Sequence, residues 1–161
     1  MSSAKEKSLL LGLLLTLALA CVVGIIFFFV HIYQRDMQAL TDFMTSYQVY
    51  DQAVTAASES AFATNGKSTP ATSEQENQAI VALSDLKTKS VVQISSLIKN
   101  EKEAMRMMRE IADLSDKEMG TLNAYLQTSE QDPNRDALAQ SFHELTKERQ
   151  ATFTNFQELG R

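Results

Sequence analysis

The first feature of the sequence is an unbroken apolar run near the N-terminus. No side chain from Ser8 to Gln34 carries a full charge when His31 is taken as neutral, and the strongly apolar core runs from Leu9 to Val30. At a rise of 1.5 Å per residue, these roughly 22 residues form a helix about 33 Å long, enough to cross a bilayer core of about 30 Å. The pattern predicts a transmembrane helix over 8–33, after a short cytoplasmic N-terminus at 1–7.

Small residues inside this run raise the question of whether it is retained. Ala18-Leu19-Ala20 has the small-x-small form of a signal-peptidase site, and Cys21 stands where a lipoprotein is cut and lipidated. Cleavage after Ala20 would leave about ten apolar residues at the new N-terminus, which is an aggregation hazard in water. A lipidated cysteine usually has a larger aliphatic residue three positions earlier, where Ala18 stands. We therefore expect an uncleaved signal anchor, with cleavage after Ala20 and lipidation of Cys21 as the alternatives.

The retained anchor carries two further expectations. Lys5 and Lys7 precede the run, whereas Arg35 and Asp36 follow it and nearly cancel. The bias of positive charge predicts a cytoplasmic N-terminus and an extracytoplasmic domain over 34–161, periplasmic if the cell is bacterial. Small residues favour close helix packing in membranes, so we also expect an intramembrane packing face. Its members are Ala18, Ala20 and Cys21.

The rest of the chain has a helical pattern of apolar residues. A 3-4 spacing runs without a miss through Leu40, Phe43, Tyr47, Tyr50, Val54, Ala57 and Ala61. Turn-forming residues at 65–70 end this segment, and Ser73 to Glu76 has the form of a capping box. Pro133 after Asp132 predicts the start of a last helix. The expected helices are 36–64, 73–99, 101–128 and 133–159.

The boundary near Asn100 decides the architecture. A single helix from 73 to 129 would be twice as long as its neighbour and would carry the charges of 99–103 into the bilayer, at a few kcal/mol per charge. Asn100 with Glu103 three residues later resembles an N-cap pattern, so we predict a turn there. The fold class is then all-α: a transmembrane helix continuing into an up-down-up-down four-helix bundle. The alternative is a long helical hairpin or coiled coil plus a third helix.

In architecture, this arrangement is similar to the ligand-sensing four-helix bundles of bacterial chemoreceptors and sensor kinases. Those families add a second membrane span and a cytoplasmic signalling domain, and the sequence predicts neither. No diagnostic motif accompanies the similarity, so it implies no family on its own.

The net charge and the cysteine content argue against several classes of partner and binding site. After Gln34 the chain has 13 basic and 19 acidic residues, a net charge near −6. This balance argues against a nucleic-acid partner and against peripheral binding to an anionic membrane surface. The single cysteine excludes an intramolecular disulfide and cysteine-type zinc sites.

Candidate chemistry is sparse. Soft thioethers could bind copper, or haem together with His143, and methionines gather at Met105, Met107, Met108 and Met119. Met105 and Met108 lie on the apolar stripe of the helix expected at 101–128, which continues through Ala112, Met119 and Leu122, so a core role is favoured. The sequence contains no Glu-x-x-His, no phosphate-binding glycine loop and no Gly-x-Ser-x-Gly. We therefore expect no enzymatic activity, no cofactor and no metal.

The remaining hypothesis is a non-enzymatic, membrane-anchored interaction or accessory subunit of a membrane or cell-envelope complex. Its partner would be another membrane or envelope protein, or a second copy in a homo-oligomer. Aromatic residues anchor many interfaces, and the expected partner contacts are Phe153, Tyr47 and Tyr50. The alternative is an extracytoplasmic ligand- or stress-sensing bundle that signals through a partner.

Overall fold

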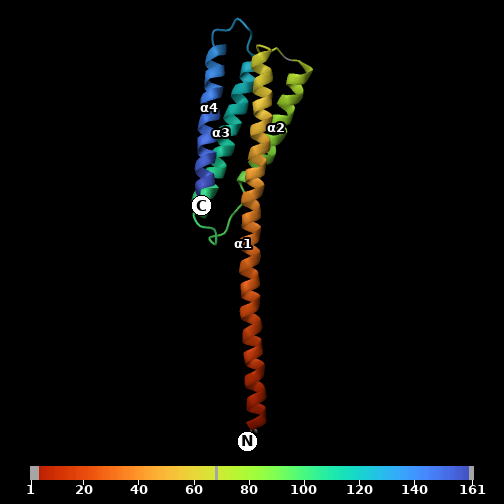
Figure 1. Cartoon of the computed structure of the whole chain (residues 1–161), viewed down its shortest axis with the longest axis vertical. Coiled ribbons are helices and arrows are strands. Elements are labelled where there is room, and N and C mark those ends of the chain that lie inside the picture. Colours follow the sequence, from red (N-terminus) through yellow and green to blue (C-terminus); the bar gives the residue numbers. More distant parts are fainter. Residues whose placement is uncertain (1–3, 68, 160–161) are drawn as a thin grey trace.

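The computed structural model describes residues 4–67 and 69–159, with side chains from Gly12 onward. Among these residues there are four helices and no strand, which confirms the all-α class. The helices are α1 (Ala4–Ala63), α2 (Pro70–Ser90), α3 (Glu101–Gln127) and α4 (Arg135–Leu159). Figure 1 shows the upper half of α1 packed with the other helices in a compact head, while its lower half stands alone.

Helix α1 runs without interruption from the apolar run into the head. Its 60 residues correspond to a length of about 90 Å. Every side chain from Gly12 to Arg35 is exposed except Ile32, which is half-buried. Among the described residues, α1 is the one helix long and apolar enough to cross a membrane. The buried stripe of the head begins a few residues later, at Asp36 and Phe43.

Helix α2 differs at both ends from the predicted range 73–99. It begins at Pro70, because the Thr69 side chain accepts a hydrogen bond from the Thr72 N–H (3.1 Å) and proline suits the first helical turn. The capping box expected at Ser73 is therefore not the helix start. The helix ends at Ser90, where two β-branched valines follow, and the Ser95 N–H of the next segment donates to Asp36 of α1.

Helices α3 and α4 begin near the predicted positions, but with different caps. Asn100 precedes α3 in a left-handed conformation (φ 61°), and its side chain makes no capping hydrogen bond. The predicted N-cap pattern with Glu103 is therefore not formed. Helix α4 starts at Arg135 rather than at Pro133, and Asp132 accepts the Asn134 N–H (2.8 Å) within the preceding turn. Because α2 and α3 are separate helices, the long-hairpin alternative does not describe the fold.

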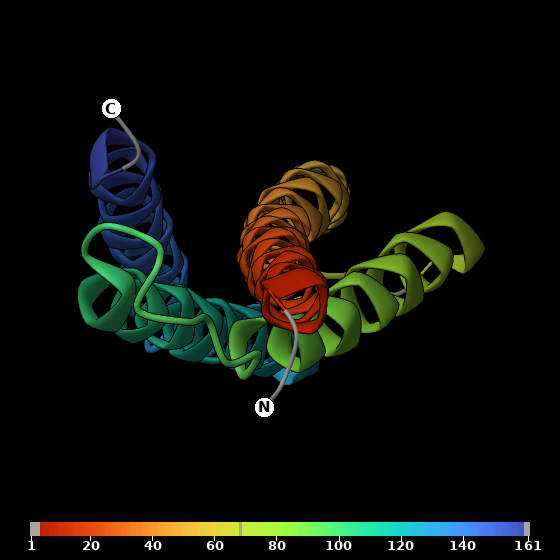
Figure 2. The same ribbon diagram turned by 90° about the horizontal axis from the view of Figure 1, so that it is seen from below.

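The head is built from two helix pairs. Helix α1 packs closely on α2, and α3 packs on α4, with α2 and α3 joining the pairs. Among the described residues, no Cα atom of α1 lies within 8 Å of a Cα atom of α4. Figure 2 shows this wider spacing between α1 and α4 from below. Aromatic rings bridge it: Tyr47 stacks on Phe153 (centroids 3.6 Å apart) and Phe43 meets Phe156 edge to face (5.4 Å).

Candidate functional site

A buried ion pair joins three of the four helices inside the head. Arg149 lies on the inner face of α4, and its side chain is fully buried. Its Nε lies 2.8 Å from Oε2 of Glu118 on α3, which is also fully buried. Its Nη2 lies 2.8 Å from Oδ1 of Asp51 on α1, a carboxylate that is one-third exposed. One guanidinium group therefore connects α4 to both α3 and α1.

Neutral side chains complete the shell around the Glu118 carboxylate. The Tyr50 hydroxyl lies 2.9 Å from Glu118 Oε2 and 2.9 Å from the Ser115 carbonyl oxygen. The Thr146 hydroxyl donates to Glu118 Oε1 over 2.5 Å. Both carboxylate oxygens are thus satisfied, as a buried charge requires.

The Arg149 guanidinium is also held by two aromatic rings. Its central carbon lies 5.2 Å from the centroids of Tyr47 and Tyr50, within the range of cation–π attraction. Two of its nitrogens are buried without a hydrogen-bond acceptor among the described residues: Nη1, and Nε, which is close to Glu118 Oε2 but is not aligned to donate to it. We call Arg149, Glu118, Asp51, Tyr50 and Tyr47 the central network.

The electrostatics of the central network follow from burial. Burial alone would lower the pKa of Arg149, but Glu118 and Asp51 outweigh it and hold the pKa above its usual value. Burial raises the pKa of Tyr47 to about 12, an effect that Arg149 partly opposes. Burial also raises the pKa of Tyr50 strongly, and the neighbouring Glu118 adds to the effect. At neutral pH the guanidinium is charged and both phenols keep their protons.

Two smaller polar contacts hold the ends of the head. Near the apolar run, Asp36 is 1% exposed and accepts the backbone N–H of Ser95 over 2.8 Å. Burial alone would raise the pKa of Asp36, but hydrogen bonds from Ser95 and Arg35 outweigh it and hold this pKa below its usual value. At the far end, buried Arg135 donates to the carbonyl oxygens of Thr128 and Asn65.

The predicted partner contacts lie in the core instead of on the surface. Tyr47, Tyr50 and Phe153 are 4%, 0% and 8% exposed. The prediction is wrong for Phe153, which lies one position off the 3-4 stripe of α4 that passes through Thr152 and Phe156. Helix α4 sits far from α1, so a broader face is needed to fill the space. Phe153 occupies that space against the ring of Tyr47.

The other candidate residues do not converge on a site. Ala18, Ala20 and Cys21 are exposed on the bare part of α1, so an intramembrane packing face there stays a prediction. Met108 and Met119 are core residues, and the ring of exposed His143 lies near that of Phe62 in a tilted arrangement (centroids 5.4 Å apart). In the part of the chain that the structure describes, no three His, Cys, Asp or Glu side chains are grouped to hold a metal ion.

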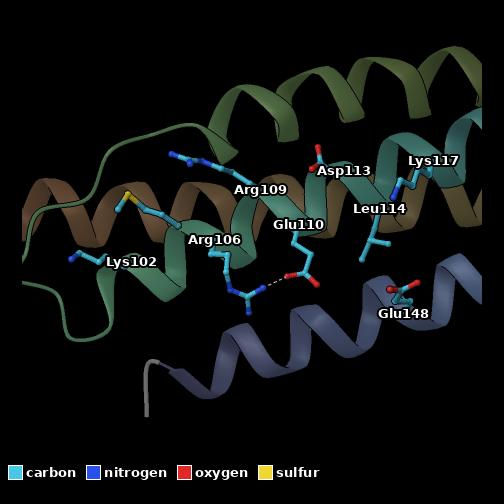
Figure 3. Close-up of a pocket in the computed structure, with 9 residues that line it drawn as sticks. Lys102, Arg106, Arg109, Glu110, Asp113, Leu114, Lys117 and Glu148 are labelled. Carbon is cyan, nitrogen blue, oxygen red and sulfur yellow. Dashed lines mark hydrogen bonds and ion pairs between the residues drawn. The ribbon is translucent and has the colours of Figure 1, made fainter.

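A shallow groove of about 620 Å³ follows the outer side of α3 (Figure 3). Arg106 in this groove pairs with Glu103 and Glu110, both at 2.6 Å. All three side chains are about half exposed, so the pairs lie on a solvated surface. The groove is lined by Lys102, Met105, Arg106, Arg109, Glu110, Asp113, Leu114 and Lys117 of α3 and by Glu148 of α4.

Comparisons with protein-family models, curated proteins and solved structures find no significant match to this chain.

Proposed function

We propose that the protein is a non-enzymatic, single-pass membrane protein whose helical head acts as an interaction or accessory module of a membrane or cell-envelope complex. The observation that supports it is the continuity of α1, which joins an exposed apolar segment to the core of the head without a break. The central network attaches α3 and α4 to this same helix through Tyr50 and Asp51. Any change in head packing is thereby coupled mechanically to the segment in the bilayer.

The proposed topology completes this arrangement. The N-terminus is cytoplasmic and the head extracytoplasmic, in keeping with Lys5 and Lys7 before the apolar run. The four helices form an up-down-up-down bundle, which places the end of α4 near the membrane. A module of this kind presents its outer surfaces to a neighbouring membrane or envelope protein, because its aromatic residues are used internally.

The test is isolation of the tagged, full-length protein from native membranes in mild detergent, followed by native mass spectrometry. We expect a complex of defined stoichiometry with another membrane or envelope protein, or with a second copy. The control replaces Leu9–Val30 with an unrelated apolar span of equal length, which separates contacts of the head from contacts of the span. A monomer without a stoichiometric partner in both samples would contradict the proposal.

A second candidate function is sensing of a small ligand, in which a change of helix packing passes through α1. The observation that favours it is the buried Nη1 of Arg149, which has no acceptor among the described residues. A small molecule with a carbonyl or carboxylate oxygen would supply one. Thermal shifts of the wild type and of the double variant Glu118→Leu/Arg149→Met against a panel of carboxylates test it: a shift in the wild type alone supports sensing, and no shift in either contradicts it.

A further inference from the structure

The α2–α3 loop, residues 91–100, lies at the end of the head nearest the apolar run. Asp36, which accepts the Ser95 N–H, stands six residues after Val30. Six helical residues span about 9 Å, and the headgroup layer extends about 5–7 Å beyond the hydrocarbon core on each side. Asp36 therefore lies at the outer edge of the headgroup layer when Val30 lies at the edge of the hydrocarbon core. Figure 1 shows the loop reaching further toward the N-terminus than the ends of the helices it joins. With the apolar run embedded, the loop therefore lies at the membrane surface.

The loop has an inner and an outer apolar side. Ile94 and Ile98 are 6% and 9% exposed and belong to the core of the head. Val91 and Leu97 point outward, at 61% and 40% exposed. A loop fixed from within by two isoleucines thus presents two apolar side chains on its free side. Exposed to water, such side chains contribute no hydrophobic stabilisation, whereas burial of their apolar surface at a membrane interface is favourable.

The charge of the head is distributed unevenly around this loop. The head as a whole is acidic, yet the segment from Lys87 to Arg109 has six basic and two acidic residues. Two of these bases are paired away from the loop: Lys87 with Asp116 on α3, and Arg106 with Glu103 and Glu110. Lys99 lies in the loop, and Lys102 follows in the first turn of α3, where both are exposed. Figure 3 shows Lys102 at the loop end of α3. The basic residues are Lys87, Lys89, Lys99, Lys102, Arg106 and Arg109.

We propose that the α2–α3 loop is a second membrane contact. Val91 and Leu97 enter the interface of the bilayer that holds α1, and Lys99 and Lys102 bind the headgroups of anionic phospholipids. The inference rests on the membrane anchoring proposed above. It assigns local lipid binding to a head whose total charge argues against it, because exposed Lys99 and Lys102 lie at the one end that faces the bilayer. The head is then held to the membrane by both α1 and the loop, and these two contacts fix its tilt relative to the bilayer, which α1 alone would not do.

The experiment uses the full-length protein in nanodiscs of phosphatidylcholine with a minority of phosphatidylglycerol. An environment-sensitive fluorophore is attached at one of three sites: native Cys21, Ser96→Cys in the loop, or Glu130→Cys at the far end of the head. The last two also carry Cys21→Ser. A spin-labelled phospholipid then quenches any fluorophore close to lipid. We expect quenching at Cys21 and at position 96, and none at position 130.

The three probes separate the two proposals. If the probe at Cys21 is quenched but the probe at position 96 is no more quenched than the one at position 130, the loop contact is overturned and the membrane anchor still holds. No quenching at Cys21 would overturn the anchor itself. A probe at position 96 that is shielded from an aqueous quencher but not reached by the lipid quencher would place protein against the loop, and would also overturn the proposal.

The choice of anionic lipid is tested separately. Lys99→Gln with Lys102→Gln should weaken the loop–membrane equilibrium in anionic nanodiscs by roughly fivefold per lysine, and should have no effect in phosphatidylcholine alone. The matched control is Lys67→Gln at the far end of the head, where the side chain pairs with Glu130 in solvent. Equal quenching of the double variant and the wild type in anionic nanodiscs would overturn the assignment of anionic headgroups.

Discussion

Arg149 and Glu118 face each other across the interior of the head, with Nε 2.8 Å from Oε2 and neither side chain exposed to solvent. Each charge has lost its hydration, and the loss is offset only while both partners and their hydrogen bonds are present. Because Arg149 also pairs with Asp51 of α1, the packing of α1, α3 and α4 depends on this one guanidinium group. The consequences can be measured.

Removing one partner of this pair should be costly. We predict that Glu118→Ala lowers the free energy of unfolding by about 3–5 kcal/mol, because it leaves Arg149 buried without its main counter-charge. The double variant Glu118→Leu/Arg149→Met should be more stable than Glu118→Ala, since it removes both buried charges together. Denaturant unfolding of the full-length protein in detergent, followed by circular dichroism, measures both.

The control for this prediction is the exposed ion pair on the outer side of α3. Arg106→Gln breaks contacts with Glu103 and Glu110, and we expect a loss below about 1 kcal/mol because solvent screens these charges. If Glu118→Ala costs no more than Arg106→Gln, the central network does not hold the helices together.

Phe153 should behave as a core residue. Phe153→Asp places a carboxylate against the ring of Tyr47, and we predict destabilisation of more than about 3 kcal/mol or failure of the head to fold. Gln150→Asp, an exposed change on the same helix, is the matched control and should shift stability by less than about 0.5 kcal/mol. If the Phe153→Asp head folds with wild-type stability, Phe153 is not a core residue and the prediction is contradicted.

The contact between Asp36 and the Ser95 N–H should depend on pH in the acid range. The pKa of Asp36 lies below its usual value, so its contribution to stability is present above the unfolded pKa of about 3.9 and is lost as the pH falls through the lower folded pKa. We predict that Asp36→Asn is less stable than the wild type by about 1–3 kcal/mol at pH 7, and that the gap closes below pH ~4. A gap independent of pH would show that the charge of Asp36 is not involved.

Tyr47 should affect stability at the alkaline end. Because burial raises its pKa to about 12, the folded head holds the phenol proton more tightly than the unfolded chain does. This contribution is present below pH ~10 and is lost as the pH rises toward the folded value. We predict that Tyr47→Phe keeps a larger fraction of its own pH 8 helical signal above pH ~11 than the wild type does. Identical alkaline transitions would contradict this.

Much of the helical core follows from spacing alone. The predicted stripe of α1 contains six residues that are buried in the structure, from Phe43 to Ala61, because the part of α1 inside the head is a straight helix that keeps one face inward. The 3-4 spacing of α4 also passes through position 149, between Leu145 and Thr152. Arg149 could have been found there, as a charge on an otherwise inward-facing stripe. Asp36 likewise stands four residues before Leu40 on the stripe of α1.

Other features depend on tertiary contacts that no local pattern contains. Glu118 lies next to the stripe drawn through Met119, and only the approach of Arg149 from α4 explains its burial. The end of α2 at Ser90 was predicted nine residues too late, because residues 91–99 have no strong helix breaker. What holds them out of a helix is the core burial of Ile94 and Ile98 together with the bond from the Ser95 N–H to Asp36.

The continuity of α1 is the central claim, and the distance between its two halves tests it most directly. Spin labels on native Cys21 and on Thr55→Cys, an exposed position in the head, are 34 residues apart along the helix. Pulsed electron paramagnetic resonance of the full-length protein in nanodiscs should give one narrow distribution centred at about 51 Å. A broad distribution, or one centred well below that value, would place a bend or hinge between the apolar run and the head and contradict the claim.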